Sequence, residues 1–160
     1  MLLSTEIAEI IRQKKSQYVR YIDTKQWSKF ELIALPNAEL SFYNPDGSIM
    51  TVGRKRLSFI SIHTFAEYFG KVFTNAQTLH MIGNAEFEMV GSDEVRVIWS
   101  MEDQIIISHY AEMRGGGYYF ETWVKTENDW FLKSLRLERT YIKYNFFARI
   151  GMLMQQIGLL

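Results

Sequence analysis

Apolar residues in the N-terminal part of the chain recur at spacings of three and four, the period of an α-helix. They are Ile7, Ile10, Ile11, Tyr18, Val19, Ile22, Trp27 and Phe30. Glu6, near the start of this pattern, suits the positive N-terminal end of a helix dipole. The pattern predicts an amphipathic helix from Ser4 onward, followed by a second short helical turn around residues 26–33.

Helical and strand-like periods then alternate along the chain. Pro36 disfavours a helical conformation in the residue before it, so the helical region is expected to end there. Residues 38–43 alternate like a strand, and Asn44-Pro-Asp-Gly is a turn signal. Helical spacing returns from Leu57 to Phe73, which predicts a further helix.

Beyond residue 75 the period is that of strands. Four long strands are predicted, at 80–90, 94–107, 117–125 and 130–141, separated by Gly91-Ser-Asp, Arg114-Gly-Gly-Gly and Glu127-Asn-Asp. The glycine run after Arg114 is interpreted as a flexible hairpin tip bordering a cavity. Helices first and an antiparallel meander after them indicate an α+β domain. We expect a cone: a strongly curved mixed or antiparallel sheet, with N-terminal helices closing a hydrophobic cavity.

Length and charge narrow the class of protein. The 160 residues fit one domain spanning 1–160. The 18 basic residues balance the 18 acidic ones, so no net field favours nucleic acid or an anionic membrane. With no cysteine, a disulfide, a thiolate metal site and a Cys nucleophile are excluded, which is compatible with the cytoplasm. No secretory signal pattern opens the chain, so a cytoplasmic location is expected.

The C-terminal run 150–160 is apolar but interrupted by Gln155 and Gln156. It falls short of the roughly 20 apolar residues that a membrane span needs. We expect a helix or tail at about 143–160 that docks on the domain or on a neighbouring subunit. The 15% aromatic content and the 8 Met residues suit either a dense core or a pocket for a hydrophobic small molecule.

Five polar residues lie in apolar or aromatic runs and are the candidate site: Tyr18, Asp23, His80, Asp103 and Arg139. Burying such groups costs several kcal/mol unless they are paired with one another or perform chemistry. This pattern is typical of an enzyme.

Several of these residues belong to a wider pattern. It consists of a helical Tyr18-x-x-x-x-Asp23, Trp27, a His that opens the first long strand, Gly117-x-Tyr119-x-Glu121-x-x-x-Lys125 and Trp130. The pattern resembles the SnoaL-like branch of the nuclear transport factor 2-like cone fold, and within it the bile acid 7α-dehydratase and scytalone dehydratase group. Glu121 and Lys125 replace the commoner Asp and Arg of this fold. The resemblance implies an enzyme without cofactor or metal that removes water from a hydrophobic cyclic substrate, such as a steroid or polyketide.

The resemblance also implies a role for each of the five residues. His80, oriented by Asp23, is the general base, since a carboxylate on one ring nitrogen fixes the tautomer and raises the basicity of the other. Tyr18 stabilises an enolate. Asp103 assists departure of the hydroxyl and Arg139 anchors Asp103 or a substrate oxygen.

Structural interpretations of the same residues stay open at this point. His80 could be a core histidine, Asp23 a helix cap, Tyr18 a core aromatic and Asp103 part of an exposed turn. Strand alternation leaves undetermined whether Arg139 or its neighbour points inward.

The remaining histidines are weaker candidates. His63 is expected on a helix, at the surface or in packing, and His109 in a polar loop. His109 lies too late in the chain to match the second histidine of scytalone dehydratase, and it has no histidine at ligand spacing beside it.

Three hypotheses of function follow. The first is the dehydratase; the second is an isomerase, cyclase or hydrolase on the same fold. The third is a non-catalytic module that binds a small molecule or assembles subunits. The expected partners are a hydrophobic small molecule and further copies of the chain. A homotrimer is favoured over a homodimer, and neither nucleic acid nor a membrane is expected as a partner.

Overall fold

The first helix begins where the sequence provides a cap. The computed structural model describes residues 3–159; Met1, Leu2 and Leu160 of the expected 1–160 domain lie outside the described residues. Helix α1 (Thr5–Asp23) starts after Ser4, whose hydroxyl accepts the N–H of Ile7 at 3.2 Å. A short 3-10 helix, η1 (Trp27–Leu32), follows. The predicted helix and second helical turn are confirmed.

The strands form one six-stranded sheet and a separate small hairpin. The sheet has the order β4-β1-β8-β7-β6-β5. Its strands are β1 (Ala34–Tyr43), β4 (Ser58–Phe59), β5 (Ala76–Met89), β6 (Glu94–Ile107), β7 (Ala111–Thr126) and β8 (Asp129–Tyr144). The hairpin consists of β2 (Thr51–Val52) and β3 (Lys55–Arg56). Strands β5 to β8 form the predicted antiparallel meander, while β1 runs parallel to β8, so the sheet is mixed.

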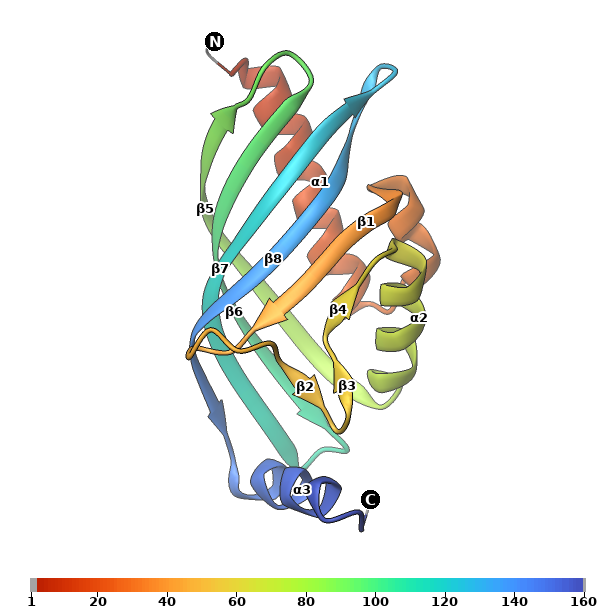
Figure 1. Cartoon of the computed structure of the whole chain (residues 1–160), viewed down its shortest axis with the longest axis vertical. Helices are drawn as coiled ribbons and strands as arrows, with labels where there is room; N and C mark the ends of the chain where they lie inside the picture. The colour runs from red at the N-terminus through yellow and green to blue at the C-terminus, as the bar shows by residue number, and fades with distance from the viewer. Residues whose placement is uncertain (1–2, 160) are drawn as a thin grey trace.

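The helices lie against one face of this strongly twisted sheet (Figure 1). Helix α2 (Ile62–Val72) begins after Ser61, whose hydroxyl accepts the N–H of Thr64. Aromatic rings fill the space between α2, η1 and β1, with centroids of neighbouring rings 5.0 to 6.4 Å apart, in a cluster of Phe30, Phe42, Phe59, Phe65 and Phe69. Aromatic pairs prefer such separations. The α+β cone expected from the sequence is confirmed.

Two local predictions were wrong in the region between η1 and β5. Pro36 does not end the helical region, because it lies inside β1, where the pairing with β8 is irregular between Ala34 and Glu39. Such an irregular stretch tolerates a residue that has no N–H to donate. The helix expected from Leu57 begins only at Ile62, because Ser58 and Phe59 pair with β1 as β4.

The glycine run was also misinterpreted as a hairpin tip. The turn between β6 and β7 lies at Ser108 and His109, which adopt positive φ angles of 52° and 65°. Gly115 to Gly117 instead lie buried within β7, which therefore begins earlier than predicted. The reason is close approach: a Cβ on Gly117 would lie 2.1 Å from the carbonyl oxygen of Glu138.

The C-terminal segment folds into a helix at the end of the sheet far from the N-terminus (Figure 1). Helix α3 (Phe146–Gln156) is capped by Asn145, whose side chain accepts the N–H of Ala148 at 2.9 Å. Residues 143 and 144 of the expected 143–160 segment belong to β8 instead. In the part of the chain that the structure describes, no helix is long and apolar enough to cross a membrane.

Replacement of Gly117 by alanine tests the close approach of β7 to β8. We expect Gly117→Ala to lower the free energy of unfolding by about 1–3 kcal/mol, because the new methyl group meets backbone atoms that cannot move aside. Gly151→Ala in α3 is the matched control, because nothing lies within 4 Å of its Cβ. It should raise the stability by about 0.5–1 kcal/mol. Equal effects in urea unfolding would contradict the argument.

Candidate active site

A mostly apolar cavity of about 320 Å³ lies between the helix-covered face of the sheet, α2, the small hairpin and α3. Apolar side chains form most of its wall, among them Ile22, Phe42, Leu57, Phe69, Ile105, Met113 and Leu137. The polar lining includes Tyr18, His80, Asp103 and Arg139. Four of the five candidate residues therefore line one cavity, and the aromatic residues serve both the core and the wall of this pocket.

Asp23, the last residue of α1, holds His80 of β5. Its Oδ1 lies 2.7 Å from His80 Nδ1 and accepts the hydroxyl of Thr78 at 2.8 Å, while Oδ2 accepts the backbone N–H of His80 at 3.0 Å. A carboxylate only accepts, so the hydrogen bond places a proton on Nδ1 and leaves the lone pair of Nε2 free. Asp23 is thus the partner of His80 rather than a helix cap.

Asp103 and Arg139 form a second pair beside the histidine. His80 and Asp103 are directly opposite in the β5–β6 ladder, and Asp103 Oδ2 lies 3.8 Å from His80 Nε2. Arg139 donates to both oxygens of Asp103, at 2.8 and 2.6 Å, and both residues are buried. The side chains of Asp103 and Arg139 therefore point inward, which the alternation of the sequence had left undetermined.

Gly115 makes this pair possible, and sequence reasoning missed it. Arg139 on β8 must reach across β7 to meet Asp103 on β6. A Cβ on Gly115 would lie 2.3 Å from the Nη1 atom of Arg139. The glycine run was visible in the sequence, but the side chain that passes over it is distant in the chain.

Tyr18 is buried in the cavity wall with its hydroxyl unpaired. The residue is 1% exposed, and within residues 3–159 the hydroxyl has no hydrogen-bond partner. Burial, reinforced by Tyr119 and Glu121, raises the pKa of Tyr18 well above its ordinary value, so the phenol keeps its proton and can donate. The Nε of Arg139 is also unpaired among the described residues. Both groups are unpaired donors on residues that line the cavity.

Two acidic residues and one arginine lie around His80. The carboxylates of Asp23 and Asp103 and the guanidinium of Arg139 together carry a formal charge of −1. Burial tends to raise the pKa of Asp23, but the hydrogen bonds from His80 and Thr78 together lower it below its ordinary value. Burial likewise tends to lower the pKa of Arg139, and Asp103 raises it overall. Asp23 and Arg139 therefore keep their charges.

The other histidines do not line the cavity. His63 is exposed on α2, and His109 is exposed in the β6–β7 turn. Over residues 3–159 no three His, Asp or Glu side chains gather in a group that could hold a metal ion.

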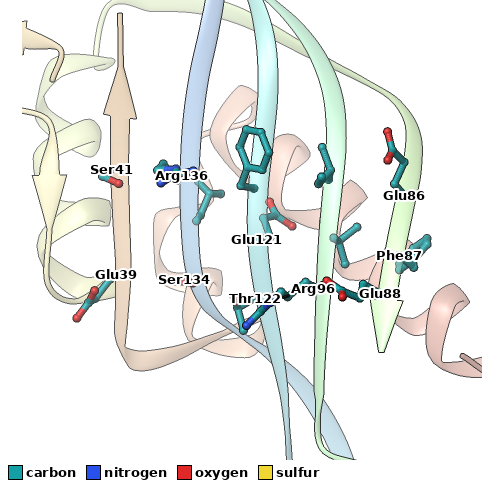
Figure 2. Close-up of a pocket in the computed structure, with 14 residues that line it drawn as sticks. Glu39, Ser41, Glu86, Phe87, Glu88, Arg96, Glu121, Thr122, Ser134 and Arg136 are labelled. Carbon is teal, nitrogen blue, oxygen red and sulfur yellow. Dashed lines mark ion pairs between the residues drawn. The ribbon is translucent and has the colours of Figure 1, made fainter. Parts of the chain in front are cut away.

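A wider hollow lies on the opposite face of the sheet, away from α1 (Figure 2). It encloses about 570 Å³ and carries side chains of both signs, such as Glu39, Arg96 and Arg136, with small polar residues between them. It contains none of the five candidate residues. The cavity around His80 is therefore the better candidate for chemistry.

Comparison with known proteins finds one matching family model and a similar protein of known sequence. A family model described as a SnoaL-like domain matches residues 4–136. A protein of Gibberella zeae named "Probable cyclase FGR4" is 40% identical over 146 residues, which cover 89% of this chain and 97% of that protein.

Solved structures with 15–16% identity share the fold. A Novosphingobium aromaticivorans protein whose name suggests a scytalone dehydratase has a TM-score of 0.71 at 16% identity, over 85% of each chain. The Kribbella flavida protein Kfla4162 has a TM-score of 0.74 at 15% identity, over 90% of this chain and 97% of that one. A type 2 hexachlorocyclohexane dehydrochlorinase, LinA, has a TM-score of 0.72 at 15% identity, over 86% of this chain and 88% of that one.

The hydrogen bonds to Asp23 predict a pH-dependent contribution to stability. The pKa of Asp23 is lower in the folded protein than in the unfolded chain, where it is about 3.9. The stabilisation is therefore fully present above that pH and is lost as the pH falls through the folded-state pKa.

We expect Asp23→Asn to lower the free energy of unfolding by about 1 kcal/mol near neutral pH, because an amide binds the histidine less strongly. The gap to the wild type should narrow between about pH 5 and pH 2 in urea unfolding. A gap that stays constant with pH would contradict a charged Asp23 in this role.

Proposed function

The chain belongs to the SnoaL-like domain family, and from that premise we propose that it is a cofactor-independent lyase, a dehydratase of a hydrophobic cyclic substrate. The substrate carries a carbonyl group and a hydroxyl on the β-carbon. One observation supports the proposal most: the 2.7 Å contact of His80 Nδ1 with Asp23 leaves His80 Nε2 free at the wall of an apolar cavity. That arrangement is suited to a general base.

In the first step, Nε2 of His80 removes a proton from the carbon next to the carbonyl. The electron pair of the broken C–H bond moves onto the carbonyl oxygen as an enolate. The free hydroxyl of Tyr18 donates a hydrogen bond to this oxygen, since the donor is fixed in place and costs no rearrangement. The new imidazolium lies between the carboxylates of Asp23 and Asp103, which stabilise its charge.

In the second step, the enolate collapses and the bond from the β-carbon to the hydroxyl group breaks. His80 returns its proton from Nε2 to the departing hydroxyl, which leaves as water, and the product is a conjugated carbonyl compound. Asp103 is a poor proton donor because both of its oxygens accept from Arg139. Its role is to hold the imidazolium and, with Arg139, to fix the position of the leaving oxygen.

The cavity supports a compact substrate. Its volume of about 320 Å³ lies at the lower end of the range of about 300–1,000 Å³ typical of small-molecule sites. A small ring system of polyketide type, or a steroid that extends through the cavity mouth, would place its apolar body against the Phe and Ile side chains.

A ring-closing reaction is the second candidate function. It is favoured by one observation, the name "Probable cyclase FGR4" of the relative that is 40% identical. The same enolate could attack a second carbonyl of the substrate in an aldol-type closure, with His80 returning its proton to the new alkoxide. Elimination removes one water without adding a ring, so mass and NMR spectra of the product distinguish the two.

We also propose that the chain assembles into a homo-oligomer, with a trimer favoured over a dimer. Apolar side chains are exposed along α3 and directly after it, among them Phe146, Phe147, Leu153 and Ile157. Apolar patches of this kind are typical of surfaces that bind other proteins.

Loss of the base should slow turnover strongly. We expect His80→Ala to reduce the elimination rate about 10²- to 10⁴-fold, because the substrate loses its proton acceptor. The assay follows the absorbance of the conjugated product from a panel of cyclic β-hydroxy ketones.

The other two histidines provide matched controls for this experiment. His63→Ala and His109→Ala remove exposed rings that do not line the cavity and should leave the rate unchanged. Circular dichroism checks that all three variants are folded. Full activity of folded His80→Ala would contradict the proposed mechanism.

A further inference from the structure

A second buried ion pair lies behind the cavity wall, and the mechanism above does not use it. Lys15 of α1 binds Glu121 of β7, and the two side chains are 1% and 0% exposed. The other oxygen of Glu121 accepts the indole N–H groups of Trp99 and Trp123, at 2.8 and 2.9 Å. Both oxygens of the Glu121 carboxylate therefore have partners, one of them Lys15 and the other the two indoles.

The ammonium group of Lys15 lies against two tyrosine rings of the cavity wall. Its Nζ is 4.2 Å from the ring centroid of Tyr18 and 3.5 Å from that of Tyr119. Lys15 comes three residues before Tyr18, so the two share one face of α1. Since both rings line the cavity, the cation lies directly behind the surface that faces a ligand.

Stability alone does not explain this pair. Burial lowers the pKa of Lys15, and Glu121 only partly opposes the effect, so burying the charge is costly. Apolar residues of similar volume are often as stable at such a position. The ammonium of Lys15, in contrast, is attracted to the faces of both phenol rings and so holds the ring of Tyr18 in place. Its positive charge also favours donation by the Tyr18 O–H and opposes the effect of Glu121, which raises the pKa of Tyr18.

We propose that Lys15, held by Glu121, is a positioning residue that fixes the ring of Tyr18 and strengthens its hydroxyl as a donor to a negatively charged oxygen in the cavity. The inference rests on the proposed role of Tyr18 toward an enolate. Lys15 and Glu121 would then influence the reaction through Tyr18 without contacting the substrate themselves. The unpaired hydroxyl of Tyr18 is the group through which the effect reaches the ligand.

The test uses 4-nitrophenol, whose anion absorbs visible light and carries a phenolate oxygen that resembles an enolate. Absorbance titration of the probe with protein at several pH values gives its affinity as the phenol and as the anion. The key variant is Lys15→Met with Glu121→Gln, which removes both charges and keeps an acceptor for the two indoles. Lys14→Met is the matched control, because Lys14 binds Asp129 and the carbonyl of Trp130 and does not line the cavity.

We expect the wild type and Lys14→Met to bind the anion in preference to the phenol. In the charge-free double variant this preference should fall about tenfold, with the affinity for the neutral phenol nearly unchanged. Tyr18→Phe should reduce the preference in the wild type and have little further effect in the double variant, since Lys15 acts through Tyr18.

The proposal is overturned if the folded double variant keeps the wild-type preference, if the wild type shows none, or if the effects of Tyr18→Phe and the double variant simply add. Should the double variant fail to fold, Lys15→Gln with Glu121→Gln removes the charges while keeping a hydrogen bond between the two side chains. The titration needs no turnover, so it is independent of the dehydratase assay. If that assay fails while the probe binds as expected, the proposed function is contradicted and the role of Lys15 is still supported.

Discussion

The hydrogen bond between Asp23 and His80 joins the C-terminal end of α1 to β5, the edge strand of the sheet, and the geometry of the cavity depends on it. Thr78 and the backbone N–H of His80 bind the same carboxylate, so helix and strand meet through three polar contacts. Because the carboxylate only accepts, the contact also decides which ring nitrogen faces the cavity. A structural joint and the preparation of a base are therefore the same interaction.

The buried charges of the cavity form a nearly balanced set. Asp103 has its charge matched by Arg139, which reaches it only because Gly115 has no side chain. Asp23 has no cation of its own and is bound by hydrogen bonds from His80 and Thr78 instead. Lys15 and Glu121 form a second buried pair of opposite charges, behind the wall of the cavity. Such pairs contribute little to stability, since their desolvation offsets their attraction, which favours a chemical reason for their presence.

Local signals in the sequence were sufficient for much of the fold. Ser4 marked the start of α1, and the alternating residues of β6 gave its bounds, Glu94–Ile107, directly. Non-local contacts explain the errors: Pro36 is tolerated in an irregular stretch of β1, and the glycine run serves the approach of β8 to β7. A glycine placed for a neighbouring strand has the same sequence signature as a glycine placed for a turn.

The candidate site was predictable in its residues but not in its geometry. The pattern containing Tyr18 and Asp23 identified the family, whereas the inward direction of Arg139 depends on the alternation of β8, which is interrupted by a register shift between Gly116 and Gly117. The Lys15–Glu121 pair was beyond sequence reasoning because two adjacent lysines, Lys14 and Lys15, are usually at the surface.

The tautomer of the His80 ring tests the central claim most directly. Nitrogen NMR of ¹⁵N-histidine-labelled protein, at alkaline pH where the ring is neutral, distinguishes the two ring nitrogens. The account predicts a proton on Nδ1 and a free lone pair on Nε2, with this preference lost in Asp23→Asn. A neutral ring with its proton on Nε2 would contradict it, because no base would then face the cavity.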